Sequence, residues 1–239
     1  MKIFELQKKY RDFGLDVKNL DFEPGLVHGL IGPNGCGKTT LAKIIAGIVP
    51  ADRCEIDYRG LTARDITMTS QKPYIMHDTV LGNLIYPLKL RGVKPDEEKI
   101  GHWLGFCGLE EKRMAYARSL SSGQQQKLSL ARALIFEPKL VIIDENLSNF
   151  DLDAVEAFER ELMRIQEVKP ITWVIISHQL SHVRRLCDRV HFMSGGRALK
   201  TGTAEDVFLN PSEPELKRFL KYSSGLSATE DLSDLVPGI

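Results

Sequence analysis

Three near-continuous apolar runs predict strands buried inside a parallel sheet. The runs are LVHGLI at 26–31, LVII at 140–143 and ITWVII at 171–176. Strands covered by helices on both faces show no polar alternation, because neither face meets water. After the first run, apolar residues recur at helical spacing, at Leu41, Ile44, Ile45 and Ile48. Residues 154–168 are also helical in pattern, so the chain as a whole predicts an α/β fold with a mainly parallel sheet.

The pattern changes between residues 78 and 135. Helical pieces there are interrupted by the breakers Pro87, Gly92, Pro95 and Gly108. A stretch of this kind predicts a helical subdomain inserted into a single domain that spans 1–222. The expected plan is a core with a β subdomain at about 1–77 and 136–222, and a helical subdomain at about 78–135.

The last fifty residues predict three further features. A hairpin is expected to turn at 194–196, and a helix to begin near Glu213. The tail at 223–239 is polar and contains glycine, which predicts disorder.

The composition gives no indication of a nucleic-acid or anionic-lipid partner. The 239 residues include 32 Lys and Arg and 32 Asp and Glu, so no overall attraction to nucleic acid or anionic lipid is expected. The first residues lack the apolar core of a signal peptide, and no apolar run approaches the roughly 18 residues of a membrane span. We therefore expect a soluble, cytosolic protein with four reduced cysteines. Cys36, flanked by glycines, is either a reactive thiol or a small packing residue.

The segment GPNGCGKT at 32–39 matches the pattern G-x-x-x-x-G-K-[ST] between a predicted strand and a predicted helix. Glycines let the backbone curl so that its N–H groups point at phosphate oxygens. Lys38 would reach the β- and γ-phosphates, and the Thr39 hydroxyl would ligate Mg²⁺. The predicted nucleotide-binding residues are Gly32, Pro33, Asn34, Gly35, Cys36, Gly37, Lys38, Thr39 and Thr40.

A second candidate site is LVIIDE, an apolar strand that ends in two carboxylates. Asp144 is suited to holding a hydrated Mg²⁺, and Glu145 to orienting an attacking water. Solvated acids in a strand-end turn would give the same pattern. Beside a phosphate loop, the catalytic interpretation is favoured.

A third feature is LSSGQ at 120–124, at the start of a predicted helix. Ser121 with Gln124, and Ser122 with Gln125, each fit a capping box that satisfies the helix's own amides. A helix N-terminus rich in hydroxyls and glycine also suits a phosphate. The pattern alone leaves both roles open.

Taken together and in this order, the phosphate loop, LSSGQ, LVIIDE and the histidine after ITWVIIS resemble the ATP-binding cassette of ABC transporters. The resemblance covers roughly residues 1–222. It implies a P-loop NTPase core of the RecA-like type with a mainly parallel sheet, an N-terminal antiparallel β subdomain and an inserted helical subdomain. It also implies ATP hydrolysis with Mg²⁺.

The resemblance implies roles for residues around the bound ATP. Tyr10 matches the aromatic residue that stacks on adenine, with Phe13 as the other candidate. Glu145 resembles the catalytic base, and His178 resembles the switch histidine that contacts the γ-phosphate; both would act with Lys38. Three residues would serve Mg²⁺, namely Thr39, Gln71 and Asp144.

Other matching residues would act between two cassettes. In this family the signature motif reaches the ATP held by a second subunit. Asp151 resembles the aspartate of the loop that links the cassettes. One phosphate loop and one signature per chain complete two sites only in a head-to-tail pair, either a homodimer or a pair with a related cassette. The residues that would cap the partner's γ-phosphate are Ser121, Ser122, Gly123 and Gln124.

Two segments depart from the usual family sequence. The signature reads LSSGQ where the family usually has LSGGQ. Ser122 therefore adds a side chain and a hydroxyl beside the backbone. Residues 146–151 read NLSNFD where the usual family sequence is closer to PTSALD. Asn149 and Phe150 would therefore alter contacts between cassettes. Because the catalytic residues are all present, we expect tuned activity rather than a dead ATPase.

The function implied is an ATPase subunit that energises a membrane transporter, with import favoured. Expected partners are transmembrane permease subunits, a second ATPase subunit and an extracytoplasmic binding protein, which would place the chain at the inner face of the membrane. The segment after Gln71 would form the permease-binding groove. Its apolar contacts, if these side chains do not pack in the core, would be Tyr74, Ile75, Met76 and Leu81.

Three other functions fit parts of the sequence. A soluble ABC ATPase acting on nucleic acid or ribosomes would resemble tandem cassettes or carry long coiled coils, and the neutral charge gives no basic stripe. A small-molecule kinase shares the phosphate loop but leaves LSSGQ unexplained. A zinc site at HQLSH, 178–182, lacks the glutamate base, because Gln179 occupies its position.

Overall fold

The computed structural model describes residues 1–70, 72–144 and 152–223. Two compact units are distinguished, one formed by residues 1–60 with the chain from 172 onward, the other by residues 61–171. Three residues predicted to act at the site, Gln71, Glu145 and Asp151, lie outside the described residues, as do the rest of the NLSNFD segment and the tail beyond Ser223.

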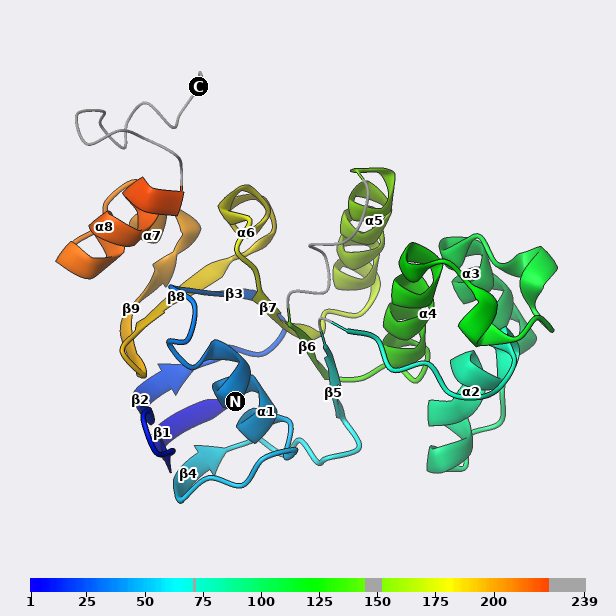
Figure 1. The fold of residues 1–239 in the computed structure, drawn as a ribbon, viewed down its shortest axis with the longest axis horizontal. Helices are drawn as coiled ribbons and strands as arrows, with labels where there is room; N and C mark the ends of the chain where they lie inside the picture. Colours follow the sequence, from blue (N-terminus) through cyan, green and yellow to red (C-terminus); the bar gives the residue numbers. More distant parts are fainter. Residues whose placement is uncertain (71, 145–151, 224–239) are drawn as a thin grey trace. The chain divides into compact units, whose positions relative to one another are not determined.

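The first unit contains a small antiparallel sheet and a set of mainly parallel strands (Figure 1). The antiparallel sheet has the order β2-β1-β4, which confirms the predicted β subdomain. In the second set, β3 lies between β7 and β8 and is parallel to both, and β9 runs antiparallel to β8. The strands are β1 (Lys2–Lys9), β2 (Gly14–Asp21), β3 (Val27–Ile31), β4 (Arg53–Asp57), β7 (Thr172–Ile176), β8 (Arg189–Ser194) and β9 (Arg197–Thr203).

The apolar runs at 26–31 and 171–176 are confirmed as buried strands, because every residue of β3 and β7 is buried. The predicted hairpin is confirmed between β8 and β9, where Gly195 and Gly196 have positive φ angles of 52° and 78°. The carbonyl of Gly196 accepts a hydrogen bond from the Asp16 amide at 2.8 Å, which joins this hairpin to the antiparallel sheet. The helices of this unit are α1 (Lys38–Ile45), α6 (Leu180–Leu186), α7 (Ala204–Phe208) and α8 (Pro214–Ser223).

The second unit combines a parallel strand pair with helices. The strands β5 (Ile66–Thr69) and β6 (Leu140–Asp144) are paired in parallel, and all of β6 is buried, as the LVII run predicts. Among the described residues, no helix is long and apolar enough to span a membrane. The helical elements are α2 (Val80–Arg91), α3 (Glu97–Cys107), η1 (Glu110–Lys112), η2 (Ala117–Ser119), α4 (Ser122–Leu134) and α5 (Leu152–Val168).

Three of the four predicted helix breakers lie at helix boundaries, and one does not. Gly92 and Gly108 end α2 and α3 in the left-handed conformation that favours glycine, and Pro95 precedes the N-cap of α3. Pro87 lies inside α2, so the expected interruption there is wrong. The fixed φ of proline is compatible with a helix, and the helix continues for one more turn before Gly92 stops it.

Two buried histidines form a hydrogen-bonded chain in the first unit. His28 Nδ1 lies 3.0 Å from His191 Nε2, His28 Nε2 lies 3.0 Å from the carbonyl of Glu23, and His191 Nδ1 lies 3.0 Å from the Thr201 hydroxyl. Since the Glu23 carbonyl only accepts, His28 Nε2 donates to it, His191 Nε2 donates to His28, and Thr201 donates to His191. Every donor then has an acceptor while both rings are neutral. Burial lowers the pKa of His28, and burial followed by the charge of His28 lowers the pKa of His191 to about 3.

This histidine pair predicts acid sensitivity of the first unit. Below pH 6.5 the unfolded chain binds protons that the folded pair does not. The free energy of unfolding is therefore highest above this pH and falls as the pH drops toward the folded pKa. His191 alone should cost about 1.4 kcal/mol per pH unit in this window. In a Trp103→Phe background, urea unfolding followed by the fluorescence of Trp173, which is buried in β7, measures this unit.

His191→Leu supplies the control, because it removes one of the titrating rings. Its unfolding free energy should depend on pH less steeply between pH 5 and pH 6.5, by about 1.4 kcal/mol per pH unit. Equal slopes in the two proteins would contradict a neutral, buried His191.

Candidate functional site

The phosphate loop joins β3 to α1 and is shaped by glycines. Gly32, Gly35 and Gly37 have φ angles of 148°, 75° and 104°, which side chains disfavour. At Gly32 the constraint is also steric, because a Cβ atom there would lie 2.0 Å from the carbonyl oxygen of Met193 in β8. The loop therefore runs directly against the neighbouring strand, and only glycine fits at its first position.

Lys38 brings its positive charge back over the loop. Its side chain is only 5% exposed, and Nζ donates hydrogen bonds to the carbonyls of Gly32 at 2.7 Å and Pro33 at 3.0 Å. The N-cap of α1 is Gly37, so no N-cap side chain engages the first amides of the helix. The ammonium group and the helix N-terminus together make this loop electropositive, as an anion site requires.

Cys36 is buried in the same loop. Burial raises the pKa of its thiol, and the opposing effect of Lys38 is smaller. A thiol with a raised pKa is a weak nucleophile. Of the two roles that the sequence left open, the structure favours packing.

Tyr10 and Phe13 form an aromatic pair next to the phosphate loop, which only Phe13 is shown to contact. Tyr10 and Phe13 have ring centroids 6.5 Å apart with an interplanar angle of 29°, and the Tyr10 amide donates to the Phe13 carbonyl at 2.7 Å. Phe13 reaches the loop itself, because its Cζ atom would lie 2.8 Å from a Cβ atom placed on Gly37. Tyr10 is 48% exposed. The two rings are therefore one local unit, with Phe13 against the loop and Tyr10 open to solvent.

Asp144 ends β6 in the second unit. It is 5% exposed and follows four buried apolar residues of the strand. A carboxylate buried in this way needs positive charge or hydrogen-bond donors around it. Its neighbour Glu145 lies outside the described residues, so the predicted pair is seen through Asp144 alone.

The start of α4 contains one capping box. The Ser121 hydroxyl accepts from the Gln124 amide, and the Gln124 side chain accepts from the Ser121 amide, both at 3.3 Å. The second predicted box is wrong, because the Gln125 side-chain amide instead donates to the carbonyls of Leu120 at 3.0 Å and Arg118 at 3.3 Å. The box that forms does not involve the amides of Ser122 and Gly123.

The segment predicted to form a permease groove is held by two residues that the sequence analysis missed. Asn83, which is fully buried, accepts from the Met76 amide at 2.9 Å and donates to the Thr79 carbonyl at 3.0 Å. Arg132 of α4 donates to Asn83 Oδ1 and to the Tyr74 carbonyl. The sequence signal for Asn83 is its position, because it is a polar residue at a core position of a helix.

The four apolar residues predicted for this groove divide by exposure. Tyr74 is 70% exposed, whereas Ile75 is only 5% exposed and belongs to the core. Met76 and Leu81 are half-buried. Tyr74 is thus the side chain of this group that is most available to a partner.

His178 is an exposed residue between β7 and α6. It lines a cavity of about 540 Å³ whose walls come from α6, α7 and α8. His182, the second histidine of HQLSH, lies within α6 and lines the same cavity.

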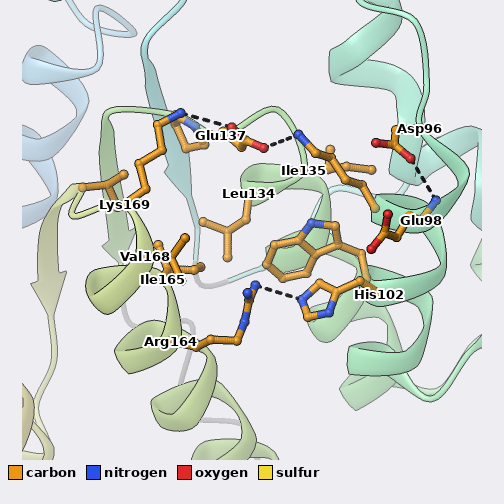
Figure 2. Close-up of a pocket in the computed structure, with 14 residues that line it drawn as sticks. Asp96, Glu98, His102, Leu134, Ile135, Glu137, Arg164, Ile165, Val168 and Lys169 are labelled. Atoms are coloured by element: carbon orange, nitrogen blue, oxygen red, sulfur yellow. Dashed lines mark hydrogen bonds and ion pairs between the residues drawn. The ribbon is translucent and has the colours of Figure 1, made fainter.

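Another cavity, of about 460 Å³, lies in the second unit between α3, α5 and the end of α4, and none of the predicted site residues lines it (Figure 2). Its cations are matched by carboxylates. Glu137 pairs with Lys99 and, at 3.1 Å, with Lys169. Glu161 pairs with Arg164 at 2.7 Å and with His102 at 3.0 Å. Asp96 and Glu98 also line the cavity, so its carboxylates balance its lysine and arginine side chains and leave no excess charge for an ionic ligand.

Residues 15–148 match the family model described as ABC transporter. The chain is 38% identical over 200 residues to the tungstate uptake system ATP-binding protein TupC of Peptoclostridium acidaminophilum, covering 81% of this chain and 92% of that protein. It is 32% identical to the molybdate/tungstate import ATP-binding protein WtpC of Pyrococcus horikoshii, covering 94% and 68%. It is also 32% identical to the methionine import ATP-binding protein MetN 1 of Listeria monocytogenes, covering 90% and 69%.

Two solved structures share the fold. An ATP-binding subunit of an ABC transporter superposes with a TM-score of 0.82 at 24% identity, covering 93% of this chain and 98% of that one. The cbiO1 protein of Clostridium perfringens, part of the ABC transporter complex cbiONQ, has a TM-score of 0.72 at 26% identity, covering 92% and 94%.

The fold is that of a P-loop NTPase. Within this class, the chain belongs to the ABC transporter family and is an ATP-binding subunit with ATPase activity. The family membership favours transport over the nucleic-acid and ribosome alternative.

The close contact at Gly32 can be tested by substitution. Gly32→Ala adds a Cβ atom against the Met193 carbonyl as well as backbone strain, so it should destabilise the fold by about 3 kcal/mol or more. Gly35→Ala is the matched control, because its φ is also positive but no atom lies within 4 Å of the added Cβ. Backbone strain alone should cost about 1–2 kcal/mol. Thermal unfolding without nucleotide measures both, and equal losses would contradict the steric role of Met193.

Proposed function

We propose that this chain is the ATPase subunit of an import system, and that two copies act as a head-to-tail pair at the inner face of the membrane. The observation that carries the proposal is the electropositive phosphate loop, where Lys38 and the N-terminus of α1 are placed together. Import is supported by the names of the relatives, which are uptake or import proteins. The permease would be a separate membrane protein.

In this proposal the residues divide the work on ATP. Lys38 and the amides of the loop bind the β- and γ-phosphates, and Tyr10 or Phe13 covers the adenine ring. Glu145 accepts the proton of the attacking water, and His178 contacts the γ-phosphate. Because the nucleophile is water, the products are ADP and phosphate.

Mg²⁺ fits the donor set. Thr39 presents a hydroxyl at the start of α1, and Asp144 presents a buried carboxylate at the end of β6; both are the hard oxygen ligands that Mg²⁺ prefers. Gln71, whose side-chain carbonyl is also a hard donor, completes the proposed set. When bound, Mg²⁺ neutralises the charge that develops on the phosphate oxygens.

The start of α4 supports a role in a second copy's site. The capping box fixes Ser121 and Gln124 but does not use the amides of Ser122 and Gly123, so helix capping and phosphate binding are compatible there. Ser121 and Ser122 are both exposed. We propose that this helix start caps the γ-phosphate held by the partner cassette, with Asp151 in the loop that links the two.

For the cargo, we propose an oxyanion of the tungstate and molybdate class. The support is the relative TupC, named for tungstate uptake, which this chain covers over 92% of its length, whereas it covers 69% of the methionine protein. Methionine is the second candidate. Selection would lie with the permease and an extracytoplasmic binding protein, and Tyr74 is the proposed permease contact.

The shared-site mechanism predicts the behaviour of Glu145→Gln. Loss of the base should lower ATP hydrolysis by about 10²- to 10⁴-fold and leave ATP binding intact. The solution mass of this variant should double on addition of Mg·ATP. Adding Ser121→Arg should prevent the doubling, whereas Ser212→Arg, an exposed serine in the other unit, should not. A mass that stays monomeric with Mg·ATP would contradict ATP-driven pairing of this chain.

The cargo proposal predicts which solute stimulates the assembled transporter. With its permease and binding protein in vesicles, ATP hydrolysis should rise when tungstate or molybdate is supplied outside. Stimulation by methionine alone would assign the cargo to the second candidate.

A further inference from the structure

The aromatic pair formed by Tyr10 and Phe13 is also contacted by a cation. Lys8 belongs to β1 and precedes Tyr10 by two positions. Its ammonium group lies over the Tyr10 ring, with Nζ 5.8 Å from the ring centroid. A cation within about 6 Å of the centroid is attracted by the negative charge on the face of the ring. One face of Tyr10 is therefore engaged by Lys8.

Lys8 is itself held by Asp52, the residue that precedes β4. Lys8 Nζ donates a hydrogen bond to Asp52 Oδ1 at 2.8 Å, and the Lys8 side chain is only 17% exposed. The second carboxylate oxygen accepts from the Lys9 amide at 2.7 Å. The hydrogen bond from Lys8, followed by that from Lys9, lowers the pKa of the Asp52 carboxyl, so this group is ionised at neutral pH. Asp52 therefore fixes both the ammonium group and the main chain next to Tyr10.

Phe13 connects Tyr10 to the phosphate loop. The Tyr10 amide donates to the Phe13 carbonyl at 2.7 Å, and Phe13 Cζ would lie 2.8 Å from a Cβ atom placed on Gly37. Phe13 is half-buried, whereas Tyr10 is 48% exposed. Tyr10 is therefore the ring of the pair that is more accessible to a ligand, while Phe13 ties the pair to the loop.

We propose that Lys8 and Asp52 are positioning residues for the nucleotide, because they hold the Tyr10 ring ready to stack on the adenine of ATP. The inference rests on the proposed function of the phosphate loop and Tyr10, and it adds the residues that orient the ring. An exposed tyrosine samples several rotamers, and fixing one of them on binding weakens affinity. Lys8 restricts the ring before the nucleotide arrives. Because Tyr10 is 48% exposed, ring surface is left for a flat, neutral base.

Binding of ADP and of inorganic pyrophosphate to the full-length chain, each with Mg²⁺, tests this role. ADP carries the base and is a product of hydrolysis, so calorimetric titration reports binding alone, whereas pyrophosphate lacks the base. Lys8→Met keeps the aliphatic stem and removes the charge. It should raise the Kd for ADP by about two- to fivefold and leave the Kd for pyrophosphate unchanged.

Lys18→Met is the matched control. Lys18 is an exposed lysine of β2 whose partner is Glu5 at 3.9 Å, so its replacement removes a charge from the same sheet and keeps the cation over Tyr10. Its affinities for both ligands should equal those of the unchanged protein. A loss of ADP affinity as large as in Lys8→Met would overturn the proposal, by assigning the effect to net charge.

A double-mutant cycle shows whether Lys8 acts through the ring. Tyr10→Ala should raise the Kd for ADP by about 5- to 150-fold, as the loss of a base-stacking aromatic does. Adding Lys8→Met to Tyr10→Ala should then have no further effect, whereas Tyr10→Phe keeps the ring and should stay sensitive to Lys8→Met. An undiminished effect of Lys8→Met without the ring would overturn the proposal, by indicating direct contact between Lys8 and the nucleotide.

Two further variants separate the cation from its carboxylate partner. Lys8→Arg keeps a cation that can face the ring and pair with Asp52, so its Kd for ADP should stay within about twofold of that of the unchanged protein. Asp52→Asn keeps an oxygen for the Lys9 amide but loses the charge that holds Lys8, so it should weaken ADP binding and leave pyrophosphate binding unchanged. Full ADP affinity in Asp52→Asn would overturn the role of Asp52.

The outcomes distinguish this inference from the proposed function. If neither ADP nor pyrophosphate binds to the unchanged protein, the proposed nucleotide site fails, and the inference fails with it. If ADP binds but Tyr10→Ala leaves its Kd unchanged, the adenine role of Tyr10 and the positioning by Lys8 are both overturned. If Tyr10→Ala weakens ADP binding while Lys8→Met has no effect, or affects ADP and pyrophosphate equally, only the positioning by Lys8 is overturned.

Discussion

The nucleotide site depends on how closely the main chain approaches strand β8 at Gly32. β3 is buried between β7 and β8, so the chain leaves it in a fixed direction and must turn at once. The Met193 carbonyl occupies the space that a side chain at Gly32 would need. At the other end of the loop, the side chains of Phe13 and Leu15 lie close to Gly37. Held from two sides, the loop has little freedom to change the direction of its amides.

This arrangement explains why the small antiparallel sheet matters to the site. Phe13 lies between β1 and β2, and the Asp16 amide in β2 bonds the Gly196 carbonyl of the hairpin that contains Met193. The two walls of the phosphate loop are thereby connected to each other. A substitution in the β1–β2 connection can therefore affect phosphate binding without contacting phosphate, through the position of Phe13.

Much of the fold follows from local pattern, and the departures have physical reasons. Buried strands such as β3, β6 and β7 read as apolar runs, because both faces are covered. Pro87 lies inside a helix although proline usually ends one. Its fixed φ is compatible with the helix, and the hydrogen bond that it removes is a local loss. Gln125 was expected to cap, but carbonyls of the preceding turn lie within its reach. Such choices depend on tertiary neighbours that a sequence window does not contain.

The candidate site was predictable where chemistry is carried by a contiguous motif and less so elsewhere. The phosphate loop is one segment, so its residue types report its geometry directly. The sequence could not show which of Tyr10 and Phe13 lies against the loop. That depends on how the β1–β2 connection folds back. Asn83 and Arg132 were missed for the same reason, since their partners lie in another segment.

The two cavities are lined by different kinds of side chain. In the cavity between α3 and α5, Glu137 pairs with Lys99 and Lys169, and Glu161 contacts Arg164 and the His102 ring, so these contacts hold the helices and leave little excess charge for a ligand. The cavity beside His178 is instead lined by the apolar side chains of Phe208, Leu209 and Leu220 together with polar residues of α6. Burying a charge is costly unless an opposite charge meets it. The paired charges between α3 and α5 are therefore better explained by the packing of these helices than by the binding of an ionic ligand.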